Sequence, residues 1–416
     1  MFSLDRFYNI LHNNLIFPLK NGMSFYFYPF GTYQVFLVLS DTEHGQTYRT
    51  DDYTRIGIRK SLDQTKAFTH CYFFDQEPLY QFTKQIVIDS EVAAGQPIWN
   101  NGRRYRLFAN SEKSEFKHQF LKERDYYDWY YFFHGFAALD WYRDFQYIRQ
   151  DSFNQFDKVF ICYNHLISKY RSYRLHLVSN LIAQDLTKHG YVSFFLRDEH
   201  GTWKDVIEDS TIPLDNRARV HIHNVLKDIS EPLIIDTKDP TGSMSATVDI
   251  KQLTSALWHI VTETVYFLPK LHLTEKIFKP IVAKRPFILV ASPGNLAYLK
   301  SYGFKTFDRW IDESYDLEED HYIRIEKITA EIAKLCALSP VALKQMHMEM
   351  QEVLEYNFQH FYGNFKKLIV NELVDNFNGI IGRINNGREP NNHSRFHQRI
   401  DFPAGYLEEV KNRLLQ

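Results

Sequence analysis

Residues 158–196 read KVFICYNHLISKYRSYRLHLVSNLIAQDLTKHGYVSFFL, and this stretch decides the fold class. The apolar run Lys158–Cys162 predicts a buried strand. An amphipathic helix is predicted over Tyr170–Lys188, because its apolar residues recur at helical spacing, and Gly190 ends the pattern. A second strand, Tyr191–Leu196, follows at once. Strand, helix and strand in this order are typical of a crossover unit on a parallel sheet.

The same alternation continues along the chain. Strands are expected at Ala256–Val265 and Pro286–Ala291, and helices at Thr274–Lys284 and Gly294–Tyr302. This part is therefore expected to be Rossmann-like. Longer helices are expected to close the chain at Asp320–Ala337, Pro340–Tyr356 and Phe358–Gly379, followed by a polar tail (Asn385–Arg399) and an amphipathic helix (Tyr406–Leu415).

The first 150 residues form a different pattern of short apolar runs. One helix is expected near Ser114–Arg124, and the half is expected to be α/β or α+β. Strands are expected at Ser24–Phe30, Gln34–Leu39, His70–Phe74, Gln85–Asp89, Tyr105–Ala109 and Asp128–Phe133. The expected domains are residues 1–150, residues 151–380 with the closing helices, and a segment of residues 381–416.

Composition excludes several classes of protein. The chain has 416 residues, with 49 Lys and Arg against 51 Asp and Glu, so it lacks the basic excess that non-specific nucleic-acid or membrane-surface binding needs. Three widely separated cysteines predict neither a disulfide framework nor a thiolate zinc site. The first 20 residues lack the apolar region of a signal peptide, and the longest apolar stretch, Trp129–Leu139, is too short to span a bilayer. We therefore expect a cytoplasmic protein. The abundance of Phe, Tyr, Ile, Asn and Lys hints at an AT-rich genome, viral or bacterial.

The most informative local pattern is VTETVYFLPKLHLTEKIFKP, residues 261–280. Thr274 is a good helix N-cap, and Glu275 in the first turn suits the helix dipole. Lys276 and Lys279 would then lie near a helix N-terminus, where an anion such as phosphate is favoured. Pro280 requires either a tight first turn or a regular helix that begins nearer Ile277. The plain alternative is a capped surface helix in which Glu275 and Lys279 form an ion pair.

With Glu263 before it, Thr274-Glu275-Lys276 resembles the nucleotide-sugar motif of the fucosyltransferase-like glycosyltransferases. Three further blocks are similar to phage-encoded glycosyltransferase-like proteins, so the resemblance covers most of residues 70–337. These blocks are residues 286–294 (PFILVASPG), residues 299–316 with LKSYGFKTF and IDESYD, and residues 128–144 (DWYYFFHGFAALDWYRD). The residues after Glu263 are Thr264-Val265-Tyr266, unlike those of fucosyltransferases, so the resemblance does not extend to fucose as donor sugar.

The resemblance implies a GT-B architecture, with two Rossmann-like domains facing a cleft and metal-independent transfer from a nucleotide sugar such as a UDP or GDP sugar. It implies that Lys276 contacts the diphosphate and that Glu275 contacts the ribose hydroxyls. Glu263 would lie near the sugar or the ribose. No cofactor is implied beyond the donor substrate itself.

A second basic element opens the helix after the strand Lys158–Cys162. Arg171 and Arg174 are spaced i,i+3 and are expected to share a face, where their guanidinium groups could hold a diphosphate. The alternative is a solvated basic helix start, which the helix dipole disfavours. The fucosyltransferase pattern also has an arginine here, and Arg174 is the better match.

The catalytic base is expected in the first domain. Asp75 and Glu77 follow a predicted strand, and either carboxylate could take a proton from the acceptor hydroxyl. His134 has aromatic neighbours that could exclude water. We rank Glu77 and Asp75 above His134, although Asp75 could simply shape a turn with Pro78, and a histidine after an apolar run is commonly a core residue.

Other patterns are weaker. His221-Ile222-His223 alternates as if on one strand face but has no companion metal ligands, and Pro293-Gly294 is not a complete nucleotide-binding glycine loop. A basic cluster at Arg103, Arg104 and Arg106, with Lys113 and Lys117, is more simply a solvated surface than an acceptor site.

We therefore expect an inverting, metal-independent glycosyltransferase that acts on a hydroxyl acceptor. The acceptor could be a modified phage DNA base, a glycan or a protein. The alternative is a non-catalytic nucleotide- or carbohydrate-binding protein that keeps the same fold.

Overall fold

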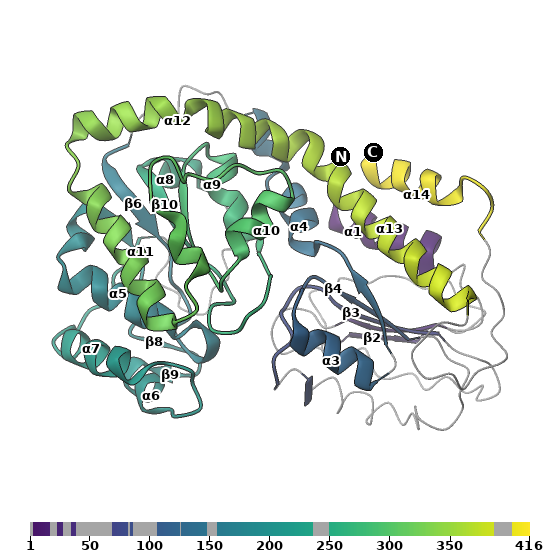
Figure 1. Ribbon diagram of the computed structural model, residues 1–416, viewed down its shortest axis with the longest axis horizontal. Helices are drawn as coiled ribbons and strands as arrows, with labels where there is room; N and C mark the ends of the chain where they lie inside the picture. Colours follow the sequence, from purple (N-terminus) through teal and green to yellow (C-terminus); the bar gives the residue numbers. More distant parts are fainter. Residues whose placement is uncertain are drawn as a thin grey trace. The chain divides into compact units, whose positions relative to one another are not determined.

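The computed structural model describes residues 3–16, 23–27, 35–38, 69–81, 84–85, 106–124, 126–147, 156–235, 249–386 and 402–416 (Figure 1). The chain divides into two compact units. The first contains Met1–Asp140 and Lys366–Gln416, and the second contains Trp141–Phe365. The expected first boundary, near residue 150, lies close to this division. Residues 366–380, which were expected to close the second domain, belong to the first unit.

The first unit is built on a five-stranded sheet in the order β2-β1-β3-β4-β5. Only β2 is antiparallel to its neighbour, and the other pairs are parallel. The strands are β1 (Met23–Phe27), β2 (Val35–Val38), β3 (Thr69–Phe74), β4 (Arg106–Asn110) and β5 (Tyr127–Tyr130). Five of the six predicted strands therefore correspond to strands of this sheet. The strand predicted at Asp128–Phe133 ends at Tyr130, and Phe133 begins a helix. Of the strand predicted at Gln85–Asp89, Gln85 is helical and residues 86–89 lie outside the described residues.

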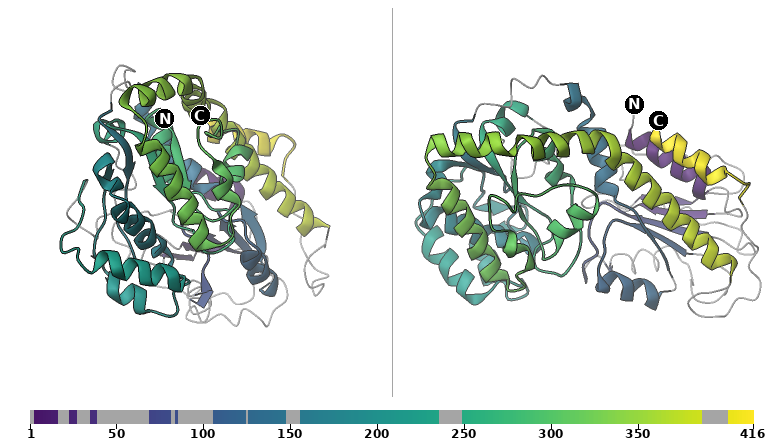
Figure 2. Two further views of the ribbon diagram at one scale, coloured as in Figure 1. Left: turned by 60° about the vertical axis from the view of Figure 1, so that its left-hand side comes forward. Right: turned by 45° about the horizontal axis from the view of Figure 1, so that its top comes forward.

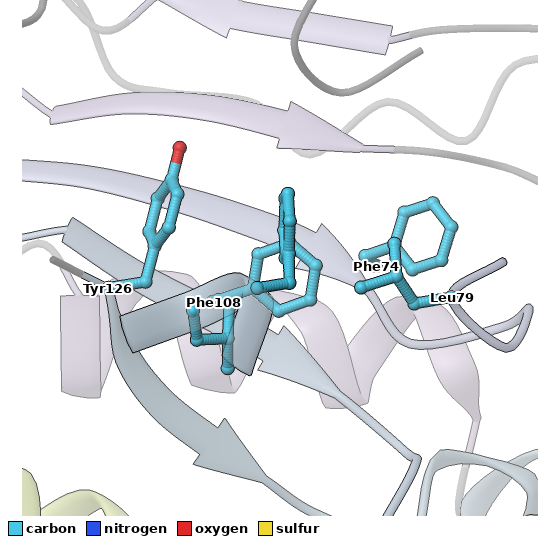
Figure 3. Packing of buried hydrophobic residues seen from close by; sticks show 6 residues of the cluster. Phe74, Leu79, Phe108 and Tyr126 are labelled. Atoms are coloured by element: carbon cyan, nitrogen blue, oxygen red, sulfur yellow. The ribbon is translucent and has the colours of Figure 1, made fainter. Parts of the chain in front are cut away.

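Helices cover both faces of this sheet (Figures 1 and 2). On one face, α3 encloses a core of aromatic and aliphatic side chains, which Figure 3 shows: Phe74, Leu79, Phe108, Phe120, Leu121 and Tyr126. On the other face, α13 packs on β5, where the Trp129 indole donates to the Leu373 carbonyl at 3.3 Å. The helices are α1 (Leu4–Ile10, continued by a π-helical turn to Ile16), α3 (Glu115–Glu123), α4 (Phe133–Trp141), α13 (Lys366–Asn385) and α14 (Tyr406–Leu415).

The two ends of the chain meet within the first unit. Helices α1 and α14 lie side by side in both figures, and Arg6 donates to the Arg413 carbonyl at 3.1 Å. The Tyr406 hydroxyl donates to the Asn14 carbonyl at 2.9 Å. These contacts explain why the C-terminal segment belongs to the first unit.

The second unit contains a four-stranded parallel sheet in the order β11-β10-β6-β7. These strands are β6 (Lys158–Cys162), β7 (Gly190–Val192), β10 (Ala256–Thr262) and β11 (Phe287–Val290). A small antiparallel pair, β8 (Arg197–Asp198) with β9 (Gly201–Thr202), lies outside this sheet. Both main sheets are largely parallel, so the predicted α/β class is confirmed.

Helices connect and surround the second sheet. Helix α5 packs against α7 and α11, and every residue from Tyr173 to Leu181 is buried. The helices are α5 (Tyr173–Ala183), α6 (Trp203–Glu208), α7 (Asn216–Leu226), α8 (Ile250–Thr254), α9 (Phe278–Val282), α10 (Asn295–Ser301), α11 (His321–Cys336) and α12 (Pro340–His360). Short 3-10 turns lie at Arg143–Tyr147, Lys169–Arg171, Leu186–His189, Glu275–Ile277 and Glu313–Leu317.

Two local predictions were wrong. His221 and His223 lie on α7 and not on a strand, because Ala218, Ile222 and Leu226 form a buried stripe at helical spacing. The break expected before Phe358 is absent, because α12 continues through a π-helical turn (Phe361–Phe365) into α13. Within the block Ile311–Asp316, the Asp316 carboxylate accepts the Leu296 amide at the start of α10.

Within the described residues, no helix is both long and apolar enough to cross a membrane. The basic residues Arg103 and Arg104 and nearly all of the predicted polar tail lie outside the described residues.

Candidate functional site

The strand order of the second sheet defines a topological switch point, the place where successive strands are added to the opposite side of the first strand. From β6 the chain goes to β7 on one side of β6, and then returns to β10 on the other side. In open α/β sheets, ligands bind at the carboxyl ends of the two strands that flank such a reversal. Here those ends are held together, because the hydroxyl of Thr262, the last residue of β10, donates to the carbonyl of Tyr163, the first residue after β6, at 2.9 Å. The residues that follow β6 and β10 are therefore the first place to look for a site.

Glu263 follows β10 directly and is completely buried, with 0 % of its surface exposed. Its Oε1 accepts the Thr274 amide at 3.1 Å, and its Oε2 accepts the Thr274 hydroxyl at 2.6 Å. The Thr264 amide lies 3.3 Å from the same Oε2. The resemblance placed Glu263 near the donor sugar or ribose. The structure instead turns its carboxylate into the protein, where polar groups of the same motif satisfy it.

Lys276 is the accessible member of this motif, with 31 % of its side chain exposed. Its Nζ donates to the Thr274 hydroxyl at 3.0 Å and to the Thr264 hydroxyl at 3.2 Å. The Glu275 Oε1 atom lies 3.9 Å from the same nitrogen, which is beyond hydrogen-bond distance. Two neutral hydroxyls and a loose ion pair with Glu275 thus hold the ammonium group at the switch point.

The segment after Thr274 begins with a tight turn. Glu275–Ile277 is a 3-10 turn whose N-cap is Thr274, and the regular helix α9 starts at Phe278 and includes Pro280. Both features that Pro280 suggested are therefore present, since the first turn is tight and the regular helix begins next to Ile277. This arrangement also means that the helix is too short for its dipole to define an anion site alone, so the charge of Lys276 is the stronger feature.

Glu275 is buried beside this lysine, and Lys279 lies half-buried in α9. Burial, together with the negative charges of Glu275 and Glu263, raises the pKa of the Tyr142 phenol well above its ordinary value. Tyr142 therefore stays protonated next to the acidic pair.

Arg174 is buried, and its guanidinium is engaged by main-chain carbonyls. Its guanidinium is 4 % exposed and donates to the Leu166 and Thr262 carbonyls, both at 3.0 Å. These carbonyls lie on opposite sides of the switch point, so Arg174 braces the site instead of facing a diphosphate directly. Arg171 lies in the preceding 3-10 turn and is half-buried, so the two arginines that were expected to share one helix face lie in different elements.

Two tyrosines that the sequence analysis missed, Tyr173 and Tyr266, make contacts that also hold together the segments around the switch point. The Tyr173 hydroxyl donates to the Glu263 carbonyl at 2.6 Å, and the Tyr173 ring stacks on Tyr266 with centroids 4.2 Å apart. Tyr266 in turn donates to the His321 carbonyl at 2.6 Å. The adjacency of Tyr173 to Arg174, just after the first strand of the unit, was the available signal.

A cavity of about 310 Å³ lies near His321. Its lining includes Asp215, Glu319 and Asp320, and Arg217 bridges the two aspartates at 2.9 and 3.2 Å. Three carboxylates against one guanidinium would repel a diphosphate. An anionic group is therefore better accommodated at Lys276 than in this cavity.

The first unit brings together its three predicted catalytic residues. His134, in the first turn of α4, is held through its Nε2, which donates to the Gln76 carbonyl at 2.9 Å, and Gln76 lies between Asp75 and Glu77. All three follow the carboxyl ends of β3 and β5. Glu77 is the more accessible of the two carboxylates.

Asp75 is 1 % exposed, and its Oδ2 accepts the Tyr131 hydroxyl at 2.5 Å and the Tyr8 hydroxyl at 2.7 Å. Burial raises the pKa of this carboxyl, and the two tyrosine hydrogen bonds oppose the rise. Asp75 is thus a buried anchor for two aromatic side chains rather than a turn-forming surface residue.

Across the part of the chain that the structure describes, no group of three or more His, Cys, Asp or Glu side chains is arranged to hold a metal ion. Comparison with protein-family models, with curated proteins and with solved structures found no match to this chain.

Proposed function

We propose that the protein is a glycosyltransferase that moves a sugar from a nucleotide-diphosphate sugar to a hydroxyl acceptor. The observation that carries this proposal is the position of Lys276. Its ammonium group lies at the switch point of a parallel sheet, where it donates hydrogen bonds to two hydroxyls and pairs with Glu275 at the longer distance of 3.9 Å. A cation in this setting suits a diphosphate, and Thr274-Glu275-Lys276 after Glu263 is the pattern that resembles a nucleotide-sugar motif.

In this proposal Lys276 binds the diphosphate, and Glu275 binds the ribose hydroxyls as the resemblance implies. Lys279 and Arg171 are proposed to contribute further positive charge to diphosphate binding. Arg174 and Tyr173 keep the segments around the site in place. The two α/β units would be the two domains of a GT-B enzyme. The donor nucleotide, such as UDP or GDP, and the sugar are not specified by these residues.

The proposed reaction is a single displacement that inverts the anomeric carbon. A base in the first unit takes the proton of the acceptor hydroxyl, whose oxygen forms a bond to the anomeric carbon. The bond from that carbon to the diphosphate breaks, and the nucleoside diphosphate leaves with the bonding electron pair. Glu77 is the leading candidate for the base, because it is more exposed than Asp75, and His134 lies in the same cluster.

Fixed cations would stabilise the charge that develops on the leaving diphosphate, which is the role that a metal ion has in other sugar transferases. The acceptor remains one of three classes: a modified DNA base, a glycan or a protein. A near-neutral net charge of −2 gives no general preference for duplex DNA.

The test is a screen of UDP, GDP, CMP and dTDP sugars by thermal shift, followed by measurement of sugar release or transfer. A donor that binds stabilises the folded protein, so the shift identifies the nucleotide before any acceptor is known. Binding accompanied by turnover supports the transferase. Binding without turnover on any acceptor class would favour a nucleotide- or carbohydrate-binding protein and overturn the catalytic proposal.

A further inference from the structure

We infer that Glu263 and Thr274 are positioning residues that prepare Lys276 for a phosphate group by fixing the direction of one hydroxyl proton. This inference rests on the proposed function and departs from the resemblance, which places Glu263 beside the donor sugar or ribose. It starts from the hydrogen bonds of two residues that are both buried, Glu263 and Thr274.

The direction of the Thr274 hydroxyl follows from its neighbours. A carboxylate has no proton to donate, so at 2.6 Å the hydroxyl must donate its single proton to Glu263 Oε2. An ammonium group has no lone pair, so at 3.0 Å Lys276 Nζ must donate to the same hydroxyl oxygen. The chain of donors therefore runs from Lys276 through Thr274 to Glu263, and the carboxylate orients the hydroxyl as an acceptor for the lysine.

This arrangement keeps the lysine charge available. If a carboxylate touched Nζ directly, it would compete with an anionic ligand for that charge. Thr274 instead stands between Glu263 and the ammonium, and Glu275 lies 3.9 Å away. An ammonium carries three N–H groups, and the hydroxyls of Thr274 and Thr264 accept two of them. The third N–H is the one that we infer binds a phosphate oxygen.

Glu263 also joins the segments that surround the site. Its carboxylate accepts the Thr274 and Thr264 amides, and its carbonyl accepts the Tyr173 hydroxyl from α5. Glu263 therefore accepts hydrogen bonds from α5 and from the Thr274 segment at the same time. Loss of its negative charge would release the Thr274 hydroxyl, and loss of its whole side chain would also leave buried amides without an acceptor.

The experiment compares Thr274→Val, Thr274→Ser and Glu263→Gln in the full chain, with UDP, GDP and inorganic pyrophosphate as calorimetric probes. Thr274→Val and Glu263→Gln should each weaken binding of the diphosphate probe roughly tenfold to a hundredfold, the range for a hydrogen bond to a charged group. Thr274→Ser keeps the hydroxyl and should bind within about threefold of the wild type, by the same reasoning. Thr254→Val is the matched control, because that buried hydroxyl bonds only to carbonyls of its own helix.

A double-mutant cycle separates positioning from general structural damage. If Thr274 acts through Lys276, Thr274→Val should cost little further affinity in a Lys276→Met background, whereas structural damage would weaken both backgrounds by the same factor. Binding of the corresponding nucleoside, which has no phosphate, should be unchanged. Thermal unfolding of each variant verifies that it is folded.

Unchanged diphosphate affinity in folded Thr274→Val, or equal losses in both backgrounds, would overturn the inference. Failure of every diphosphate probe to bind the wild type would overturn it as well. These measurements involve no sugar transfer. A protein that binds diphosphate through Thr274 and Lys276 but transfers no sugar would keep this inference and contradict the proposed function.

Discussion

The Thr274 hydroxyl donates to Glu263 Oε2 at 2.6 Å across eleven positions of sequence. The acidic residue after β10 and the Thr-Glu-Lys sequence before α9 are therefore one hydrogen-bonded unit. Within this unit Lys276 is the partly exposed residue, with 31 % of its side chain accessible, whereas Glu263, Thr274 and Glu275 are buried. The proposed donor site therefore consists of one partly exposed cation, Lys276, held by buried polar residues.

Replacement of Lys276 by Met should weaken binding of the matching nucleoside diphosphate by about 1.5 to 3 kcal/mol, because a charge-assisted hydrogen bond to phosphate is lost. Isothermal titration calorimetry measures this change. Lys251→Met, on α8 before β10, is the control and should bind as the wild type does. Equal affinities of the Lys276 and Lys251 variants would show that the diphosphate lies elsewhere.

Glu77→Gln should reduce turnover about a hundredfold or more while nucleotide affinity stays nearly unchanged, because a general base acts in the transition state. The measurement is kcat with the identified donor and acceptor, together with the anomeric configuration of the product. His134→Gln is the comparison, since an amide can still donate to the Gln76 carbonyl but cannot act as a base. Full turnover in Glu77→Gln combined with loss in His134→Gln would assign the base to His134, and a retained anomeric configuration would contradict single displacement.

The proposed transfer should continue in the presence of EDTA, because Lys276 and its cationic neighbours are expected to balance the charge of the leaving diphosphate. Initial rates with and without chelator, followed by addition of manganese, provide the measurement. Loss of turnover in EDTA that manganese restores would show that a metal is required.

Stability should fall as the pH is lowered through the range where histidine normally titrates. Burial, with Arg285 beside it, lowers the pKa of His347 to about 4, and burial lowers that of His259 to about 3. Arg285 Nη1 can only donate at 3.2 Å, so His347 Nε2 accepts and the folded state holds the neutral ring. In the unfolded chain a histidine takes up its proton near pH 6.5. The contribution of neutral His347 to the free energy of unfolding is therefore fully present above that pH and is lost as the pH falls through about 4.

For His347 alone, the expected loss at pH 5 is on the order of 2 kcal/mol relative to pH 8. His347→Gln can still accept from Arg285 and should show a smaller loss over the same interval. Urea denaturation at both pH values measures the difference. Identical pH dependence in the two proteins would contradict the assignment.

Much of the second sheet could be predicted from sequence, because its strands are buried on both faces and appear as continuous apolar runs. Strand β6 and helix α14 have the predicted bounds, Lys158–Cys162 and Tyr406–Leu415. The continuous passage from α12 into α13 could not be predicted in the same way. Asn357, a residue that usually disfavours a helix, is compensated there by hydrogen bonds to the Lys305 backbone at 2.9 Å.

The composition of the candidate site could be predicted better than its geometry. The sequence placed Glu263, Thr274 and Lys276 in one motif, but it could not show that Glu263 is enclosed, because burial depends on which distant segments cover a residue. Arg174 illustrates the same limit. Its charge and position suggested phosphate binding. In the structure its guanidinium donates to the carbonyls of Leu166 and Thr262, and Thr262 lies 88 positions away in the sequence.

The most direct test of the central claim is release of nucleoside diphosphate from a panel of nucleotide sugars by the wild type and by Lys276→Met, measured with the same coupled assay. The account predicts that the wild type releases nucleoside diphosphate from at least one of these sugars and that Lys276→Met loses most of this activity while remaining folded. Equal release by both proteins, or no release from any sugar with any of the three acceptor classes, would contradict it.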